Sequence, residues 1–275
     1  MMDAKKTFSD WLIVSDIDGT LNNKARKLPE RNKKAIERFV SNGGHFTLAS
    51  GRNPQSMEKH FKNLPIKGTP AVVINGAGVY DFDKHEMIYF SAMNDEAMRL
   101  AVKAAKKFWM VDVIVVAKDI IYITGLGAFG KWFVVVDNLK HKHIYDIAKV
   151  PKENWGKVIF SGDPVSISRV KKFFERTNSS ELTLMSSSVC SFEILAKNTH
   201  KGTAVLKLAE TLGIDKEHTG AIGDYFNDYD MLKTVGVPAC CGQAPDELKE
   251  ISEFVACHCN NGAVADFIEY IETKK

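Results

Sequence analysis

Two aspartates separated by one residue, in an Asp-Ile-Asp-Gly-Thr segment over 16–20, are the residues of this chain best suited to chemistry. They follow the apolar run 11–15, which predicts a buried strand. Side chains two positions apart on an extended strand point the same way, so we expect Asp16 and Asp18 to face one pocket. Close carboxylates repel each other unless a cation or a shared proton compensates them. The pattern therefore predicts a metal-assisted site for phosphoryl transfer.

Further polar residues follow other predicted strands, and in a parallel sheet ligands gather outside the carboxyl ends of the strands. Oxygen ligands such as Asp16, Asp18 and Asp224 suit magnesium, which completes its shell with water and substrate oxygens. Hydroxyl, amide and ammonium groups can hold a phosphate, and phosphoryl transfer depends mainly on positioning and charge neutralisation. The candidates beyond the paired aspartates are Ser50, Gly51, Arg52, Lys201, Asp224, Asn227 and Asp228.

Each of these groups also has a purely structural reading. Asp, Gly and Thr are common in turns, Ser-Gly is a frequent turn dipeptide, and a lysine such as Lys201 is ordinarily a solvated surface residue. Four such groups in order, three of them at predicted strand ends, favour a functional site.

The elements that must position these residues alternate between strand and helix. After the strand at 11–15, a helix begins near Pro29 and ends at Gly43-Gly44, and strands follow at 45–49 and 71–74 with a helix from Pro54 to about residue 64 between them. The rhythm returns in a helix that ends at Gly213, strands at 219–222 and from 235, and an amphipathic helix over 262–272. Strands joined by helices predict parallel pairing in a three-layer α/β/α core.

The middle of the chain, from about 83 to 196, has a mixed pattern that predicts an inserted second domain. We therefore expect a discontinuous core domain over 1–82 and 197–275 and an inserted α/β domain over 83–196. Within the insertion the sequence predicts helices at 94–107, 138–149 and 165–177, antiparallel strands at 111–116 and 120–123, and further strands at 132–136, 157–160, 181–186 and 190–195.

Composition points to an ordinary globular enzyme. The 275 residues are 45% hydrophobic and 26% charged, and the formal net charge of +3 is too close to neutral to indicate nucleic acid or an anionic membrane as a partner. No apolar run approaches the roughly 20 residues of a membrane span, and the first residues lack the apolar stretch of a secretory signal. We expect a cytoplasmic protein, a monomer or a homodimer.

Three other patterns have weaker functional readings. Cys240-Cys241 and Cys257-His258-Cys259 suggest zinc, but one intervening residue is unusual for zinc ligands, which favours free thiols. The G-x-G-x-x-G run at 125–130 is followed by strand-type rather than helical residues, which favours a hairpin or loop over a dinucleotide site. The basic run 138–143 is read as a solvated helix face rather than a phosphate or metal site.

Four motifs together resemble those of the haloacid dehalogenase superfamily. They read Asp-Ile-Asp-Gly-Thr-Leu, Ala-Ser-Gly-Arg, His-Lys-Gly and Gly-Asp-Tyr-Phe-Asn-Asp. Asn75-Gly76-Ala77 and the large insertion are similar to the Cof-type sugar-phosphatase branch. The run 239–244 departs from the Met-Gly-Asn-Ala-like run of relatives, which puts the local loop packing in doubt. The resemblance implies an α/β fold with a three-layer α/β/α Rossmann-like parallel-sheet core and an inserted α/β cap domain.

The resemblance also implies roles for individual residues. Asp16 would be the nucleophile that forms an aspartyl-phosphate, and Asp18 the acid and base. Mg²⁺ would be held by the Asp16 side chain, the Asp18 backbone carbonyl and Asp224, supported by Asp228. The implied phosphate-binding residues are Ile17, Ser50, Gly51, Lys201 and Asn227, and Lys201 is also placed among the catalytic residues.

The sequence thus predicts a Mg²⁺-dependent phosphatase that hydrolyses a small phosphorylated metabolite, such as a sugar phosphate. Two alternatives stay open. A phosphomutase with a related cap would pass the phosphoryl group to another sugar oxygen instead of water. A regulatory protein would bind the phosphorylated ligand without turning it over.

Overall fold

The fold is described from a computed structural model, which places residues 8–66, 68–125 and 139–274. The chain divides into two compact units, and each is described by itself. Unit 1 comprises residues up to Gly51, Met57–Ile88 and His200 onward, and unit 2 comprises Arg52–Ser56 and Tyr89–Thr199. The identity of 83–196 as a substrate-specificity domain stays a prediction.

Unit 1 is built on a five-stranded sheet in the order β14-β13-β12-β1-β2, in which all neighbours are parallel. Its central strand, β1, is buried throughout and pairs on either side with β12 and β2. The carboxyl ends of these three strands therefore meet at one edge of the sheet. The strands are β1 (Leu12–Ser15), β2 (His45–Leu48), β12 (Thr219–Gly223), β13 (Val237–Cys240) and β14 (Phe254–Val255).

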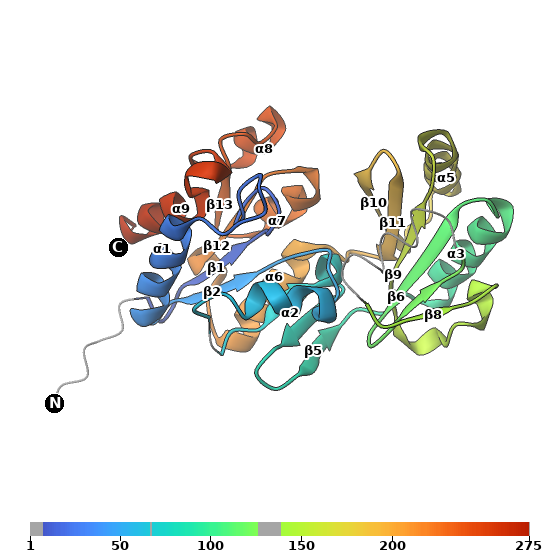
Figure 1. The fold of residues 1–275 in the computed structure, drawn as a ribbon, viewed down its shortest axis with the longest axis horizontal. Helices are drawn as coiled ribbons and strands as arrows, with labels where there is room; N and C mark the ends of the chain where they lie inside the picture. Colours follow the sequence, from blue (N-terminus) through green and yellow to red (C-terminus); the bar gives the residue numbers. More distant parts are fainter. Residues whose placement is uncertain (1–7, 67, 126–138, 275) are drawn as a thin grey trace. The chain divides into compact units, whose positions relative to one another are not determined.

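Helices cover both faces of this sheet and complete the predicted three-layer α/β/α core (Figure 1). Helices α1 and α9 pack against each other, and the Phe267 ring of α9 lies against Gly220 of β12. Helices α6 and α7 form a second packed pair. The helices of unit 1 are α1 (Glu30–Ser41), α6 (Lys201–Leu212), α7 (Tyr229–Thr234), α8 (Asp246–Ile251) and α9 (Ala263–Glu272), while α2 (Pro54–Phe61) is divided between the two units.

Local sequence explains where these helices begin and end. Pro29 has extended backbone and directly precedes α1, so the predicted start is one residue early. Helix α6 ends at Gly213, whose φ of 68° is the left-handed conformation that glycine adopts readily after a helix. Among the described residues, no helix combines the length and hydropathy that a membrane crossing requires.

A short hairpin sheet continues unit 1 beside β2. Strand β3 (Ala71–Val73) joins β2 through one parallel bridge, Ala49 to Val72, and then pairs antiparallel with β4 (Gly78–Asp81), which is followed by β5 (Glu86–Phe90). Between β3 and β4 three consecutive residues have left-handed backbone: φ is 54° at Ile74, 55° at Asn75 and 93° at Gly76. The chain therefore turns sharply at the sheet edge where β1 and β2 end.

Unit 2 contains a six-stranded sheet in the order β10-β11-β9-β6-β7-β8. The neighbours are antiparallel except β7 and β8, which are parallel. Helices α3 (Asp95–Lys107) and α5 (Pro164–Thr177) pack on a core that includes Trp155 and Phe174. The strands are β6 (Asp112–Ala117), β7 (Ile121–Ile123), β8 (His141–His143), β9 (Trp155–Ser161), β10 (Leu182–Ser188) and β11 (Ser191–Ala196).

The predicted basic helix over 138–149 is wrong. His141–His143 form the edge strand β8, paired with Ile121–Ile123, and Ile147–Lys149 form a single 3-10 turn, η2. All three side chains of β8 are exposed, as is common for a charged edge strand. The exposure of these basic residues was therefore predicted correctly, but their secondary structure was not. The expected strand at 132–136 and most of the G-x-G-x-x-G run lie outside the described residues.

We expect Gly76→Ala to destabilise unit 1 by about 3 kcal/mol, because an added Cβ would lie 2.1 Å from the His200 carbonyl oxygen in a left-handed backbone. Gly213→Ala is the matched control, since Gly213 is also left-handed but a Cβ added there would have nothing within 4 Å. This control should lose only about 1–2 kcal/mol, from backbone strain alone. Urea unfolding of the two variants measures the difference, and equal losses would contradict the close approach of Gly76 to His200.

Candidate active site

Asp16 lies immediately after β1, at the centre of the sheet edge. Its backbone N–H donates to the Ile222 carbonyl at 3.0 Å, and its carbonyl accepts from Leu21 N–H at 3.2 Å. The residue is buried, whereas Asp18 is exposed. Strand β1 ends at Ser15 and the chain turns at Gly19, where φ is 83°; the expected common orientation of Asp16 and Asp18 stays a prediction.

Lys201, the first residue of α6, is fully buried and contacts two carboxylates. Its Nζ donates to Asp16 Oδ1 at 2.6 Å and to Asp228 Oδ1 at 2.7 Å. The side chains of Lys201 and Asp228 have no exposed surface and that of Asp16 has 10%. Burying an ammonium costs several kcal/mol unless it is paired, and two carboxylates here provide that pairing.

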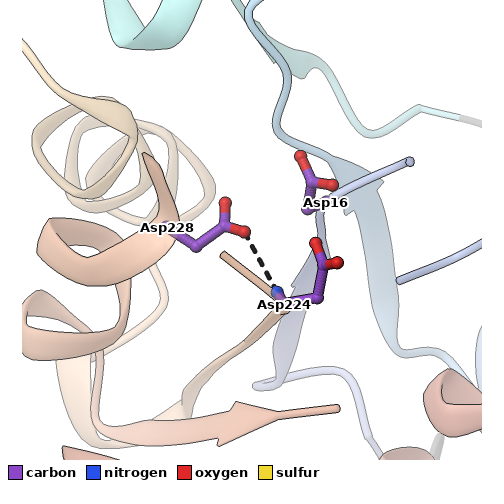
Figure 2. A group of neighbouring side chains, drawn as sticks. All are labelled: Asp16, Asp224 and Asp228. Carbon is purple, nitrogen blue, oxygen red and sulfur yellow. Dashed lines mark hydrogen bonds between the residues drawn. The ribbon is translucent and has the colours of Figure 1, made fainter. Parts of the chain in front are cut away.

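The turn after β12 supplies the other acidic residues of the site. Asp228, at the end of the 3-10 turn η5 (Phe226–Asp228), accepts the backbone N–H of Asp224 at 3.1 Å through Oδ2. Thr20 Oγ1 donates to Asp224 Oδ1 at 3.3 Å. Figure 2 shows the carboxylates of Asp16, Asp224 and Asp228 converging from two segments, and one oxygen of each lies within 4.8 Å of the others.

Charge is unbalanced in this cluster. Full ionisation of the three carboxylates beside one ammonium would leave two uncompensated negative charges in a mostly buried site. Burial raises the pKa of Asp16 to about 8 despite the opposing effect of Lys201, and burial together with Asp228 raises the pKa of Asp224 to about 6. The neighbouring carboxylates raise the pKa of Lys201, so this lysine stays charged. A divalent cation would neutralise the excess, and carboxylate oxygens at this spacing suit Mg²⁺.

Ser50 and Gly51 follow β2 at the same sheet edge. The buried Ser50 bonds through its backbone to the next segment, donating to Val72 and accepting from Asn75 N–H, each at 3.0 Å. A Cβ on Gly51 would lie 2.6 Å from Asn75 Oδ1, so the two segments approach closely here. Gly76 then contacts His200, the residue before Lys201. A continuous series of contacts therefore links the end of β2 to the lysine.

The structure thus brings Asp16, Lys201, Asp224 and Asp228 into direct or near contact. Of the remaining predicted residues, Ile17 is a buried side chain after β1 and Asn227 is half-buried within η5. Asp18 is outside the acidic group of three, although its backbone lies only two residues after Asp16. The roles predicted for these residues stay predictions.

Two contributors were not singled out from the sequence. Thr20 lies in the first motif, so the sequence shows a hydroxyl donor there. It does not show that the acceptor of this hydrogen bond is Asp224. Gln243 donates from Nε2 to the Gly19 carbonyl at 2.6 Å, across 224 residues of chain; the sequence marked only its run, 239–244, as a departure from relatives.

None of the five cysteines forms a disulfide. Cys240, Cys241 and Cys259 are buried, and burial raises the pKa of each. A raised pKa disfavours the thiolate that zinc requires. Within residues 8–66, 68–125 and 139–274, no cysteine joins a group of three that could hold a metal.

Comparisons with known proteins agree with this architecture. A family model described as haloacid dehalogenase-like hydrolase matches residues 13–268. The 5-amino-6-(5-phospho-D-ribitylamino)uracil phosphatase YwtE of Bacillus subtilis is 28% identical over 94% of this chain and 97% of its own length.

Solved structures show the same fold. A haloacid dehalogenase-like hydrolase from Bacteroides thetaiotaomicron superposes with a TM-score of 0.83 and 22% identity, over 95% of this chain and 99% of its own. A sugar phosphatase of subclass IIB of the superfamily gives a TM-score of 0.80 at 19% identity, over 95% and 99% of the two chains. Because the family model spans nearly the whole chain, including every residue of the acidic cluster, this protein belongs to the haloacid dehalogenase-like hydrolases.

Proposed function

We propose that this hydrolase is a Mg²⁺-dependent phosphatase that cleaves a small phosphomonoester through an aspartyl-phosphate on Asp16. The observation that carries the proposal is the buried Asp16 carboxylate, held by Lys201 in a cluster with two excess negative charges. Such a site is suited to a divalent cation and a phosphoryl group together, because phosphoryl transfer depends on positioning and on neutralising charge.

Asp16, Asp224 and the backbone carbonyl of Asp18 would hold the Mg²⁺, with Asp228 supporting Asp224 through its backbone N–H. When bound, the cation would neutralise charge on the phosphoryl oxygens and leave Asp16 ionised. The donor set fits, because carboxylate oxygens from two segments already lie within 4.8 Å of one another.

The nucleophile is oriented by its one strong contact. Lys201 takes Oδ1 of Asp16, and within the described residues Oδ2 has no hydrogen-bond donor, which leaves that oxygen for attack on phosphorus. As the new O–P bond forms, the P–O bond to the leaving group breaks, and Asp18 would protonate the departing oxygen. Asp18 would then accept a proton from water, whose oxygen attacks the phosphorus and releases Asp16 with inorganic phosphate.

The phosphoryl oxygens would be held by groups at the ends of three strands. Backbone N–H groups at Ile17 and Gly51, the Ser50 hydroxyl and the Asn227 amide are the proposed donors, with Lys201 supplying positive charge. All lie in unit 1, after β1, β2 and β12 or at the start of α6.

A sugar phosphate or a related small metabolite is the proposed substrate class. Support comes from the names of similar proteins, one a phosphatase of a phospho-D-ribitylamino compound and one a sugar phosphatase. We propose unit 2 as the cap that contacts the leaving group, which would make its residues the determinants of specificity.

We expect Asp16→Asn to lower phosphate release by a factor of about 10³ or more, because the amide cannot serve as the nucleophile. Acid-quenched wild-type protein should carry a phosphoryl group on Asp16, detectable by mass spectrometry, and the variant should carry none. Asp10→Asn is the control, since Asp10 is an exposed aspartate outside the site, and its activity should be unchanged. An Asp16→Asn variant that keeps most activity would rule out the proposed nucleophile.

Lys201→Met should destabilise the metal-free protein by about 3–5 kcal/mol, because it leaves buried carboxylates without their counter-charge. Lys207→Met is a matched control on the same helix: its ion pair with Glu210 is also 2.6 Å long, but both side chains are about half exposed or more. The control should change the free energy of unfolding by less than about 1 kcal/mol. Similar losses in both variants, measured by urea unfolding, would contradict the burial argument.

The stabilisation that Mg²⁺ provides should increase with pH. The raised pKa values, about 6 for Asp224 and about 8 for Asp16, mean that the metal-free folded protein binds more protons than the unfolded chain above the ordinary value of 3.8. Its stability therefore falls as pH rises from that ordinary value toward 8. Because Mg²⁺ competes with those protons, the increase in Tm at saturating Mg²⁺ should be small at about pH 5 and large at about pH 8.5.

Thermal unfolding with and without Mg²⁺ tests this dependence, and Asp224→Asn should abolish most of the gain. A gain in Tm that is the same at both pH values would show that these carboxylates do not take up the cation.

A further inference from the structure

The side chain of Gln243 joins three segments around the acidic cluster. Its Nε2 donates to the Gly19 carbonyl at 2.6 Å, and its Oε1 accepts the Cys259 backbone N–H at 3.0 Å. The Gly19 carbonyl that it binds belongs to a residue that lies against the Asp224 carboxylate. One carboxamide thus connects the loop after β13, which carries Gln243, to the loop after β1 and to the 3-10 turn η6 (Cys259–Asn261).

The Gly19 peptide is the critical member of this set. Its backbone is left-handed, and a Cβ there would lie 2.3 Å from Asp224 Oδ2, so the peptide is in close contact with that carboxylate. Gly19 also directly follows Asp18, whose carbonyl is a proposed Mg²⁺ ligand. A rotation of the Gly19 peptide would therefore disturb both Asp18 and Asp224.

From these contacts we propose that Gln243 is a positioning residue that sets the affinity of the site for Mg²⁺. The inference rests on the proposed function. Among the described residues no hydrogen bond joins Gln243 to Asp16 or Lys201, so it acts by fixing the Gly19 peptide, which lies against Asp224, rather than through the reacting atoms. Groups that orient metal ligands in this way commonly change metal affinity by about 10–100-fold when they are removed.

The chain offers a close control for this role. Asn260 also connects η6 to the loop after β1, because its Oδ1 accepts the Lys24 backbone N–H at 3.0 Å. That bond lies farther along the loop, at an exposed residue. If Gln243 merely held η6 and the loop after β1 together, losing its bond to Gly19 or losing the bond between Asn260 and Lys24 would weaken Mg²⁺ binding to a similar extent.

The test measures Mg²⁺ binding to the metal-free full-length protein by isothermal titration calorimetry, with Tm recorded without Mg²⁺. Gln243→Met keeps the chain length but removes both donor and acceptor, and we expect its Kd for Mg²⁺ to rise about 10-fold or more. Gln243→Asn, a milder change that cannot span both partners, should give a smaller increase. Asn260→Ala should leave the Kd within about twofold of wild type.

The outcomes separate the inference from the function on which it rests. A wild-type protein that binds no Mg²⁺ would overturn the proposed function. If wild type binds Mg²⁺ tightly and both Gln243 variants have the same Kd as wild type, only the proposed role of Gln243 is overturned. Equal weakening in Asn260→Ala and Gln243→Met would also overturn it, because simple attachment of the loop would then explain the effect. Since Gln243→Asn retains most of the side chain, it keeps the test decisive if Gln243→Met fails to fold.

Discussion

The paired contact of Lys201 with Asp16 and Asp228 is the interaction on which the site depends. A fully buried lysine is stable only where negative charge surrounds it, and here the two carboxylates lie 2.6 and 2.7 Å from its Nζ. The contact joins the end of β1 to the turn after β12 through the first residue of α6. It also fixes which oxygen of Asp16 faces the lysine, so the ion pair sets the orientation of the Asp16 carboxylate.

Lys201 neutralises only part of the charge that the strand ends bring together. Burial, together with the neighbouring carboxylates, therefore raises the pKa of Asp16 and that of Asp224 in the metal-free protein. The N-terminus of α6 also lies at this edge and contributes a partial positive charge. A site built in this way holds protons when it is empty of cation and exchanges them for a divalent ion, so its stability, metal binding and ionisation are linked.

Much of this arrangement was predictable because apolar runs mark the parallel strands and polar residues follow them. The strand at 11–15, the helix ending at Gly213 and the acidic turn after 219–222 were all anticipated. Prediction failed where tertiary pairing overrides local composition. The basic residues 141–143 pair with β7 as an edge strand instead of forming a helix. The sequence pointed to the run 239–244 but not to the partners of Gln243, because those partners lie 16 and 224 residues away along the chain.

Residues with positive φ form the turns after two strands of unit 1. Gly19 turns the chain after β1, and Ile74, Asn75 and Gly76 do so after β3, all with positive φ. For a β-branched residue such as Ile74 this conformation costs roughly 1–3 kcal/mol, so it persists only where surrounding contacts enforce it. Those contacts are visible: Asn75 bonds to Ser50, and Gly76 lies against His200. Packing between the segments that support the proposed ligands therefore offsets the strain at Ile74. Replacing these turns with relaxed loops would remove the strain. It would also release Lys201 and Asp224 from the positions that they hold in the acidic cluster.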